Sequence, residues 1–382
     1  MRKDYLLTPG PSPVPAEVLL SMAHPLYHHR TPRFQAILKE ATERVKRVLL
    51  TKNETAIFAS SGTGAMEAAV ANLAASGRKA LTIEGGKFGE RWTELCRAFG
   101  FAHEVIKVEW GHAVEPAAVE RALAKDRSIA AVFATHCETS TGVLNDVKAL
   151  GEIVARTDAV LVVDAISSAG CCELRTDDWK LDVVCVGSQK GLMLPPGLSV
   201  ITVSPKAKAL MEGAKARAAY YFDVPKALAA AAKDDTPYTP ALTLIIGLNE
   251  SLKMIEAEGV ENVFRRHKAL AEAIRAGAKA LGLELYSKSP SDSITAIVVP
   301  KGVDGEKVVK TLRDVHGVTF AGGQEELKGK IMRIATMGYC GRYDVIVAMA
   351  ALEMGLAEAG FKLQLGSGLR AAEEVLLARK VH

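Results

Sequence analysis

Short apolar runs alternate with amphipathic segments between about residues 55 and 205. Seven runs have the length of strands and are apolar on both faces: 56–60, 80–84, 103–108, 129–135, 159–164, 182–188 and 198–204. Between several of them lie stretches with helical spacing of apolar residues: 64–76, 89–99, 116–124 and 147–157. This alternation is typical of a mainly parallel sheet covered by helices. We therefore predict an α/β fold whose large domain contains a mainly parallel seven-stranded sheet.

The pattern changes after residue 248. A long helical stretch reaches about residue 280 and is interrupted near 258–261. Further strand-like runs (283–286, 294–299, 331–334) then alternate with helical ones (305–315, 343–358). This mixture predicts a smaller α+β domain. The first 20 residues carry four of the fifteen prolines and are typical of an extended arm. The predicted division is therefore an arm (1–20), a large domain (21–250) and a small C-terminal domain (251–382).

Composition excludes several classes of protein. A chain of 382 residues that is 49% hydrophobic can bury a sizeable core, and this excludes disorder. The net charge of +4 is small and dispersed, with no basic run beside aromatic residues, so we expect no nucleic-acid partner. No stretch of about 18 apolar residues predicts a membrane span. The six cysteines show no CxxC pair and the histidines no zinc-ligand spacing, so we expect a reduced, cytoplasmic protein without a metal.

Ligands of parallel sheets bind beyond the carboxyl ends of the strands, so candidate chemistry is sought there. The first candidate is the turn SSGTGAMEAA (60–69), which leads from a strand into a helix. Backbone amides at this helix start, with the hydroxyls of Ser61 and Thr63, would hold a phosphate group. The alternative is an ordinary helix cap, because the turn lacks both the lysine of a P-loop and the dinucleotide-binding spacing.

Three charged residues complete the set of candidates. Asp164 ends the apolar strand VLVVD and is either a strand-end cap or a buried, paired carboxylate. Lys190 lies in GSQKGLMLPPG, where it is either solvated or the amine of a Schiff base. Arg333 lies in the strand-like run KIMRIATMGY and would bind a substrate carboxylate or form a structural ion pair.

These four features complement one another in the chemistry of pyridoxal phosphate. A carboxylate keeps the pyridinium nitrogen protonated, so that the ring withdraws electrons. A lysine binds the cofactor aldehyde and then moves a proton. A phosphate site anchors the cofactor, and an arginine orients the substrate.

The chain resembles the class V aminotransferases of pyridoxal-phosphate fold type I, in the alanine–glyoxylate and serine–pyruvate aminotransferase group. The resemblance runs nearly end to end and is most specific at SQKGLMLPPG (188–197). Other matching segments are LTPGPSPVP (7–15), GGKFGER (85–91), HCETSTGV (136–143), VVDAISSAG (162–170), TPYTP (236–240) and AGGQEELKGKIMRIATMGY (321–339).

The resemblance implies a role for each matching residue. Lys190 would be the Schiff-base lysine and Asp164 the pyridinium partner, and together they would form the catalytic pair. Arg333 would bind the substrate carboxylate, with Gly10 of the arm approaching the substrate. The other implied cofactor-binding residues are Ser61, Gly62, Thr63 and Gln189 at the phosphate, Phe88 stacked on the ring, Thr139 near the ring, and Tyr238 and Thr239 from a neighbouring subunit. The resemblance thus implies a homodimer with shared active sites.

The expected reaction transfers the amino group of alanine or serine to glyoxylate or pyruvate by ping-pong half-reactions. A cysteine desulfurase is disfavoured, because no cysteine lies between residues 290 and 333. Phosphoserine or aminoethylphosphonate transamination stays open, since Arg30 or Arg342 could supply an extra cation. A non-catalytic accessory subunit is also an alternative, although the whole set of residues is retained. The resemblance places His28, His29 and Arg30 near the site entrance, where they have a surface or interface role or contact the substrate, and His136 is assigned to a structural hydrogen bond.

Overall fold

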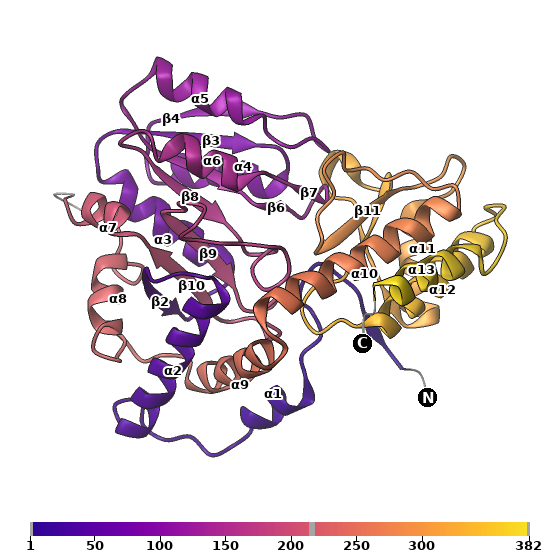
Figure 1. The fold of residues 1–382 in the computed structure, drawn as a ribbon, viewed down its shortest axis with the longest axis horizontal. Coiled ribbons are helices and arrows are strands. Elements are labelled where there is room, and N and C mark those ends of the chain that lie inside the picture. Colours follow the sequence, from indigo (N-terminus) through magenta and orange to yellow (C-terminus); the bar gives the residue numbers. More distant parts are fainter. Residues whose placement is uncertain (1–2, 214–217, 380–382) are drawn as a thin grey trace.

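A seven-stranded sheet lies at the centre of the larger part of the protein in the computed structural model, which describes residues 3–213 and 218–379 (Figure 1). The spatial order of its strands is β2-β10-β9-β8-β5-β3-β4. Their bounds are β2 Glu54–Phe58, β3 Lys79–Glu84, β4 His103–Lys107, β5 Ile129–Thr135, β8 Val160–Asp164, β9 Val183–Gly187 and β10 Ser199–Val203. Only β10 is antiparallel to its neighbours. The seven predicted strands and the mainly parallel sheet are confirmed.

Helices bury both faces of this sheet. Along β8, Leu161 and Val163 pack into one apolar core, whereas Val160 and Val162 pack into another on the opposite face. Alternate side chains of a strand point to opposite faces, so only a strand that is apolar throughout can fill both cores. The four predicted helices are present as α3 Gly62–Ala74, α4 Lys87–Ala98, α5 Pro116–Lys125 and α6 Val147–Val154. The structure adds three that were not predicted: α2 Pro32–Val48, α7 Pro205–Glu212 and α8 Val224–Ala231.

The smaller part is built on a three-stranded antiparallel sheet. Its central strand β14 Ile331–Ala335 pairs with β11 Ile294–Val298 on one side and with β13 Ala321–Gly322 on the other. The helices are α10 Val260–Ala280, α11 Gly305–Thr311, α12 Arg342–Glu358 and the unpredicted α13 Ser367–Ala378. The strand predicted at 283–286 is wrong, because only an isolated bridge joins Leu285 to Ile297. The helix predicted over 305–315 also changes at Leu312 to a π-helical turn.

The N-terminal arm connects the two parts of the protein. Strand β1 Tyr5–Leu6 pairs with β12 Val318–Thr319 of the smaller part, and the arm then runs to the large sheet (Figure 1). An arm that is extended throughout is wrong, because helix α1 occupies Ala16–Ser21.

The predicted helix interruption is confirmed at Gly259, whose φ of +85° separates α9 Leu242–Glu258 from α10. The predicted domain boundary at 250/251 falls inside α9, and it stays a prediction. In the described part of the chain, no helix combines the length and apolarity that crossing a membrane requires.

Candidate active site

The candidate residues of the large sheet converge because the parallel strands end at one edge. Asp164 is the last residue of β8, and Lys190 follows β9 by three residues. Ser61 follows β2 in the same way, and Thr139 follows β5. Phe88 lies in the first turn of α4, just after β3. Residues more than 100 positions apart in the chain are thereby placed along one edge.

Lys190 lies under the N-terminal arm. Its Nζ donates a hydrogen bond to the carbonyl oxygen of Pro9, and the Ser12 hydroxyl donates to the Lys190 carbonyl at 2.7 Å. Gly10 has φ +107°, and a Cβ at this position would lie 2.5 Å from the lysine Nζ. Burial lowers the pKa of Lys190 to about 8, so a large fraction of the amine is neutral and nucleophilic near that pH.

Asp164 is buried without an ion-pair partner among the described residues. One carboxylate oxygen accepts a hydrogen bond from the Ile166 amide at 2.8 Å. Burial raises the pKa of Asp164 to about 7, although Arg91 and Lys190 oppose the shift. A buried carboxylate is stabilised by a cationic partner. The site therefore suits a ligand that brings a protonated nitrogen to Asp164.

Arg333 reaches the large sheet from the central strand of the small one. Its Nε donates to the Gly322 carbonyl at 2.9 Å, and its Nη1 donates to the Thr139 carbonyl at 2.7 Å. Burial lowers its pKa to about 10, which leaves the guanidinium charged at neutral pH. These contacts use only two of its five N–H groups, so the others can bind a carboxylate.

The start of α3 has the features of an anion site. Ser61 is the N-cap residue, yet its side chain makes no capping hydrogen bond. Gly62 fits closely, since a Cβ there would lie 2.5 Å from the Ile166 Cδ1. The Oε1 atom of Gln189 is buried without a hydrogen-bond partner among the described residues. The amides at the helix start and the uncapped Ser61 hydroxyl are donors that suit a phosphate group, whereas the Gln189 Oε1 is an acceptor that needs a donor.

Glu138 is a functional candidate that the sequence analysis missed. Its carboxylate accepts hydrogen bonds from the amides of Phe88 (3.2 Å) and Gly89 (2.8 Å) and from the Ser140 hydroxyl (2.5 Å). The carbonyl of the next residue, Thr139, accepts the hydrogen bond from Arg333, and the Thr139 hydroxyl donates to the Ser167 hydroxyl at 2.7 Å. The segment therefore links Phe88 to Arg333. A glutamate three residues after the apolar strand β5, inside the HCETSTGV segment, was the available signal.

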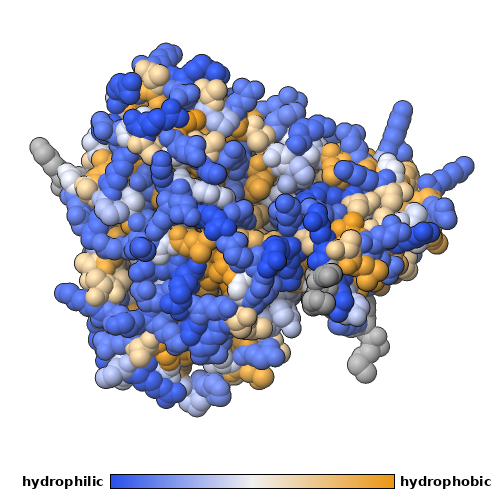
Figure 2. Space-filling view, viewed as in Figure 1, coloured by the Kyte–Doolittle hydropathy of each residue, from blue (hydrophilic) through white to orange (hydrophobic). Residues whose placement is uncertain are grey.

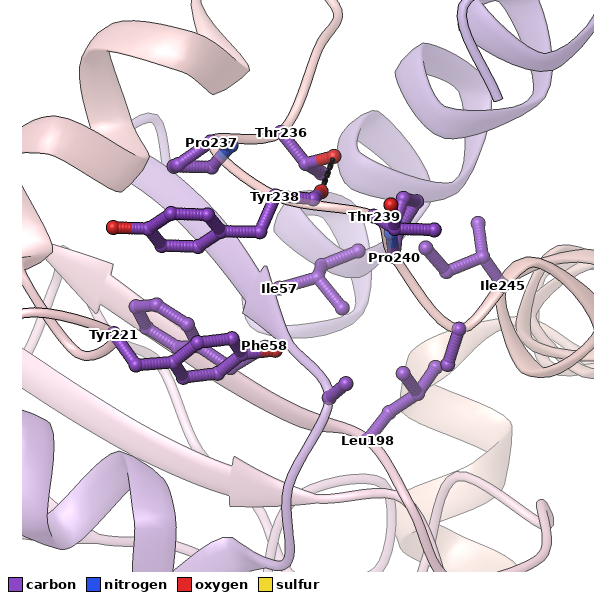
Figure 3. A pocket seen from close by; sticks show the side chains of 12 residues that line it. Ile57, Phe58, Leu198, Tyr221, Thr236, Pro237, Tyr238, Thr239, Pro240 and Ile245 are labelled. Carbon is purple, nitrogen blue, oxygen red and sulfur yellow. Dashed lines mark hydrogen bonds between the residues drawn. The ribbon is translucent and has the colours of Figure 1, made fainter. Parts of the chain in front are cut away.

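Tyr238 and Thr239 lie apart from this group within the single chain. They line a pocket with Phe58, Leu198 and Tyr221, and the rings of Tyr221 and Tyr238 stack with centroids 5.4 Å apart (Figure 3). No contact with Lys190 or Asp164 is found among the described residues. The structure thus places both residues on a surface beside the ends of β2 and β10.

The remaining candidates have structural contacts. His136 is buried, and its Nδ1 lies 2.9 Å from the Ser168 hydroxyl, which confirms the expected structural hydrogen bond. Arg30 forms an ion pair with Asp235 at 2.6 Å. The rings of His28 and His29 lie together, with centroids 4.4 Å apart, and His28 is exposed.

Comparison with known proteins identifies the family. The family model described as "Aminotransferase class-V" matches residues 4–347. This chain is a class-V aminotransferase. It is 42% identical to a protein of Synechococcus named "Soluble hydrogenase, small subunit" (98% of each chain). It is 38% identical to the L-aspartate–glyoxylate aminotransferase of Paracoccus denitrificans (97% of this chain, 96% of the other). It is also 37% identical to the serine–glyoxylate aminotransferase of Methylorubrum extorquens (98% and 96%).

Solved structures agree with this assignment. The pyridoxamine–pyruvate aminotransferase of Mesorhizobium loti superposes with a TM-score of 0.93 at 31% identity, covering 99% of this chain and 98% of the other. The class-V aminotransferase therefore has the pyridoxal-phosphate fold type I that its resemblance implied.

Proposed function

We propose that this class-V aminotransferase uses pyridoxal 5'-phosphate to move the amino group of alanine or serine to glyoxylate or pyruvate in two half-reactions. The observation that carries the proposal is that Lys190 and Asp164 lie at strand ends of the large sheet, where Arg333 of β14 reaches the Thr139 carbonyl. When bound, the cofactor withdraws electrons from the substrate Cα and carries the amino group between the two half-reactions. The residues present fit it, since the start of α3 offers backbone amides and an uncapped Ser61 hydroxyl to a phosphate, and Asp164 is a buried carboxylate without an ion-pair partner among the described residues.

Each residue has a distinct task in the proposed mechanism. Lys190 would hold the cofactor aldehyde through its neutral Nζ, and the same Nζ would take the proton from the substrate Cα. Asp164 holds a proton on the ring nitrogen. Arg333 orients the substrate carboxylate through its free N–H groups. Phe88 would cover one face of the ring, and Thr139 would lie beside it.

The donor is proposed to be small and to carry one carboxylate. A phosphorylated or second acidic group would need a further cation near Arg333. Arg30 is paired with Asp235, and Arg342 lies over the ring of Tyr343. In the described part of the chain, neither makes a contact with Arg333 or with Thr139. The related aspartate–glyoxylate and serine–glyoxylate enzymes use glyoxylate as acceptor by name, which supports the same acceptor here.

A panel of amino donors tests the proposal. Protein loaded with the cofactor should show the absorbance of the lysine-bound form, and alanine or serine should remove it with release of the matching oxoacid. Lys190→Ala should show neither signal, whereas Lys148→Ala, at an exposed lysine of α6, should behave as the wild type. Transamination by Lys190→Ala would contradict the mechanism. Loss of absorbance with phosphoserine alone would contradict the proposed donor.

We also propose a homodimer in which Tyr238 and Thr239 complete the partner's site. Tyr220 is 79% exposed and Tyr221 40% exposed beside Tyr238, which is unusual for aromatic side chains. Figure 2 shows apolar surface in a hollow near the middle of one face, rimmed by hydrophilic side chains. The six cysteines are all buried free thiols, and this supports a cytoplasmic location.

Mixed dimers test the shared site. Lys190→Ala and Tyr238→Ala subunits should each be inactive or nearly so alone. After random subunit exchange, half of the dimers are hybrids, and each hybrid has one site with both residues intact. We therefore expect activity to return to about a quarter of the wild-type value by simple counting. No recovery despite exchange, or a monomer in light scattering, would contradict the proposal.

A further inference from the structure

The proposed phosphate site has no positive charge of its own. Ser61, Gly62, Thr63 and Gln189 are all uncharged, while a phosphate monoester carries about −1.5 to −2 charges at neutral pH. A helix N-terminus contributes only about half a positive charge. A tightly held phosphate in this position would therefore be expected to have a cation beside it.

Arg91 is a cation that lies beside the proposed phosphate site. It belongs to α4, and its Nη1 donates a hydrogen bond to the Thr63 hydroxyl at 3.2 Å. Its guanidinium carbon also lies 4.9 Å from the centre of the Phe88 ring, one helical turn earlier. Thus a single side chain touches both the phosphate site and the aromatic residue proposed to cover the cofactor ring.

Arg91 forms no ion pair with a carboxylate across residues 3–213 and 218–379, although its charge lowers the pKa of the nearby Asp164. Its guanidinium contacts the Thr63 hydroxyl and the Phe88 ring instead. Lys87, four residues earlier on the same helix, is different, because its Nζ lies 3.3 Å from Glu90, 3.6 Å from Glu325 and 3.9 Å from Glu94. Arg91 is therefore available to an anion, whereas Lys87 is not.

We infer that Arg91 binds the phosphate group of the cofactor and at the same time holds Phe88 against the cofactor ring. The inference rests on the proposed function and adds a residue to its cofactor site. Only one N–H of the guanidinium is used by Thr63, so four remain to bind phosphate oxygens. The flat face can stack on Phe88 without giving up those hydrogen bonds. A lysine could supply the charge but not both contacts.

Binding of two cofactor forms to cofactor-free protein tests the inference. Pyridoxal 5'-phosphate and pyridoxal differ only in the phosphate, and both can be titrated by absorbance on the wild type, Arg91→Gln, Arg91→Lys and the control Lys87→Gln. Arg91→Gln should weaken binding of the phosphate form by 10- to 100-fold and change pyridoxal binding by less than threefold. Arg91→Lys should fall between, and Lys87→Gln should match the wild type. Inorganic phosphate should compete less well in Arg91→Gln.

Other results would overturn the inference. Unchanged binding of the phosphate form to Arg91→Gln would remove Arg91 from the site. An equal loss for both cofactor forms would show that Arg91 acts on the ring alone. Circular dichroism and urea unfolding identify any variant that fails to fold, in which case Arg91→Lys decides the question by the same comparison. Failure of the proposed function is distinguishable: without the proposed cofactor chemistry the wild type itself would not bind the cofactor covalently, and a different amino donor would leave these titrations unchanged.

Discussion

Replacing Asp164 by asparagine should stabilise the cofactor-free protein above pH 7 and abolish transamination. The carboxylate is buried and has no ion-pair partner in the described part of the chain, so its ionisation in the folded state is unfavourable. A rise of its pKa from 3.8 to about 7 corresponds to about 4 kcal/mol of unfolding free energy. Asparagine keeps an oxygen for the Ile166 amide without the charge.

The pH dependence follows from the direction of this shift. Because the folded pKa is raised, the folded state binds more protons than the unfolded state between about pH 4 and 7. The contribution of Asp164 to stability is therefore complete below pH 4 and is lost as the pH rises to 7. In urea unfolding, the free energy of unfolding of the variant should come to exceed that of the wild type over this range, by up to about 4 kcal/mol at pH 8. Asp158→Asn, at the exposed residue just before the same strand, is the control.

Cofactor binding should reverse the order of stability, so that the wild type becomes more stable than Asp164→Asn. A protonated ring nitrogen would pair with Asp164 in the wild type but not with asparagine, so loading should stabilise the wild type more. A wild-type-minus-variant difference that is flat from pH 4 to 8 would refute the reasoning about burial. Transamination by Asp164→Asn at the wild-type rate would refute its assignment as the ring partner.

Three further substitutions probe the other contacts. Arg333→Lys loses the planar fork, so KM for the amino acid should rise by 10- to 100-fold in steady-state assays, and an unchanged KM would contradict its role. Gly10→Ala places a methyl group 2.5 Å from the Lys190 Nζ at a φ of +107°, so stopped-flow absorbance should show slower cofactor attachment; wild-type kinetics would contradict the close packing. Glu138→Gln turns an amide donor toward backbone donors, which should cost about 1–3 kcal/mol in urea unfolding and weaken the circular dichroism of the bound cofactor. Glu90→Gln should do neither, and equal effects of both would contradict a specific role for Glu138.

The sheet was predictable because its strands are apolar on both faces. Runs of this length and apolarity have few alternatives to a buried strand in a folded chain, and all seven form strands. The run at 283–286 has the same local appearance, but only Leu285 finds a partner across the sheet. Whether a run forms a paired strand depends on which other segment of the chain lies beside it, and the local sequence pattern does not contain this information. Helix α13 was not predicted, since it is defined by packing against α10 and α12.

Residue type and position along the chain were sufficient to nominate Asp164, Lys190 and Arg333. Each follows or lies within an apolar strand, where burying a charge is unfavourable unless the charge is paired or hydrogen-bonded. The position of Glu138 near a strand end was visible in the sequence, but its hydrogen-bond partners were not, because they are the backbone amides of Phe88 and Gly89, about 50 residues away. Because every residue except proline has a backbone amide, the residue type does not identify such a partner.

The sequence alone determined the α/β class, the positions of the main strands along the chain and the identity of the charged candidates, because hydrophobic period and residue chemistry are local properties. Only the tertiary structure decided that β14 delivers Arg333 to the Thr139 carbonyl, that the arm lies over Lys190, and that Lys190 and Asp164 have shifted pKa values. These features arise from burial and from contacts between distant segments. Both depend on how the chain packs in three dimensions.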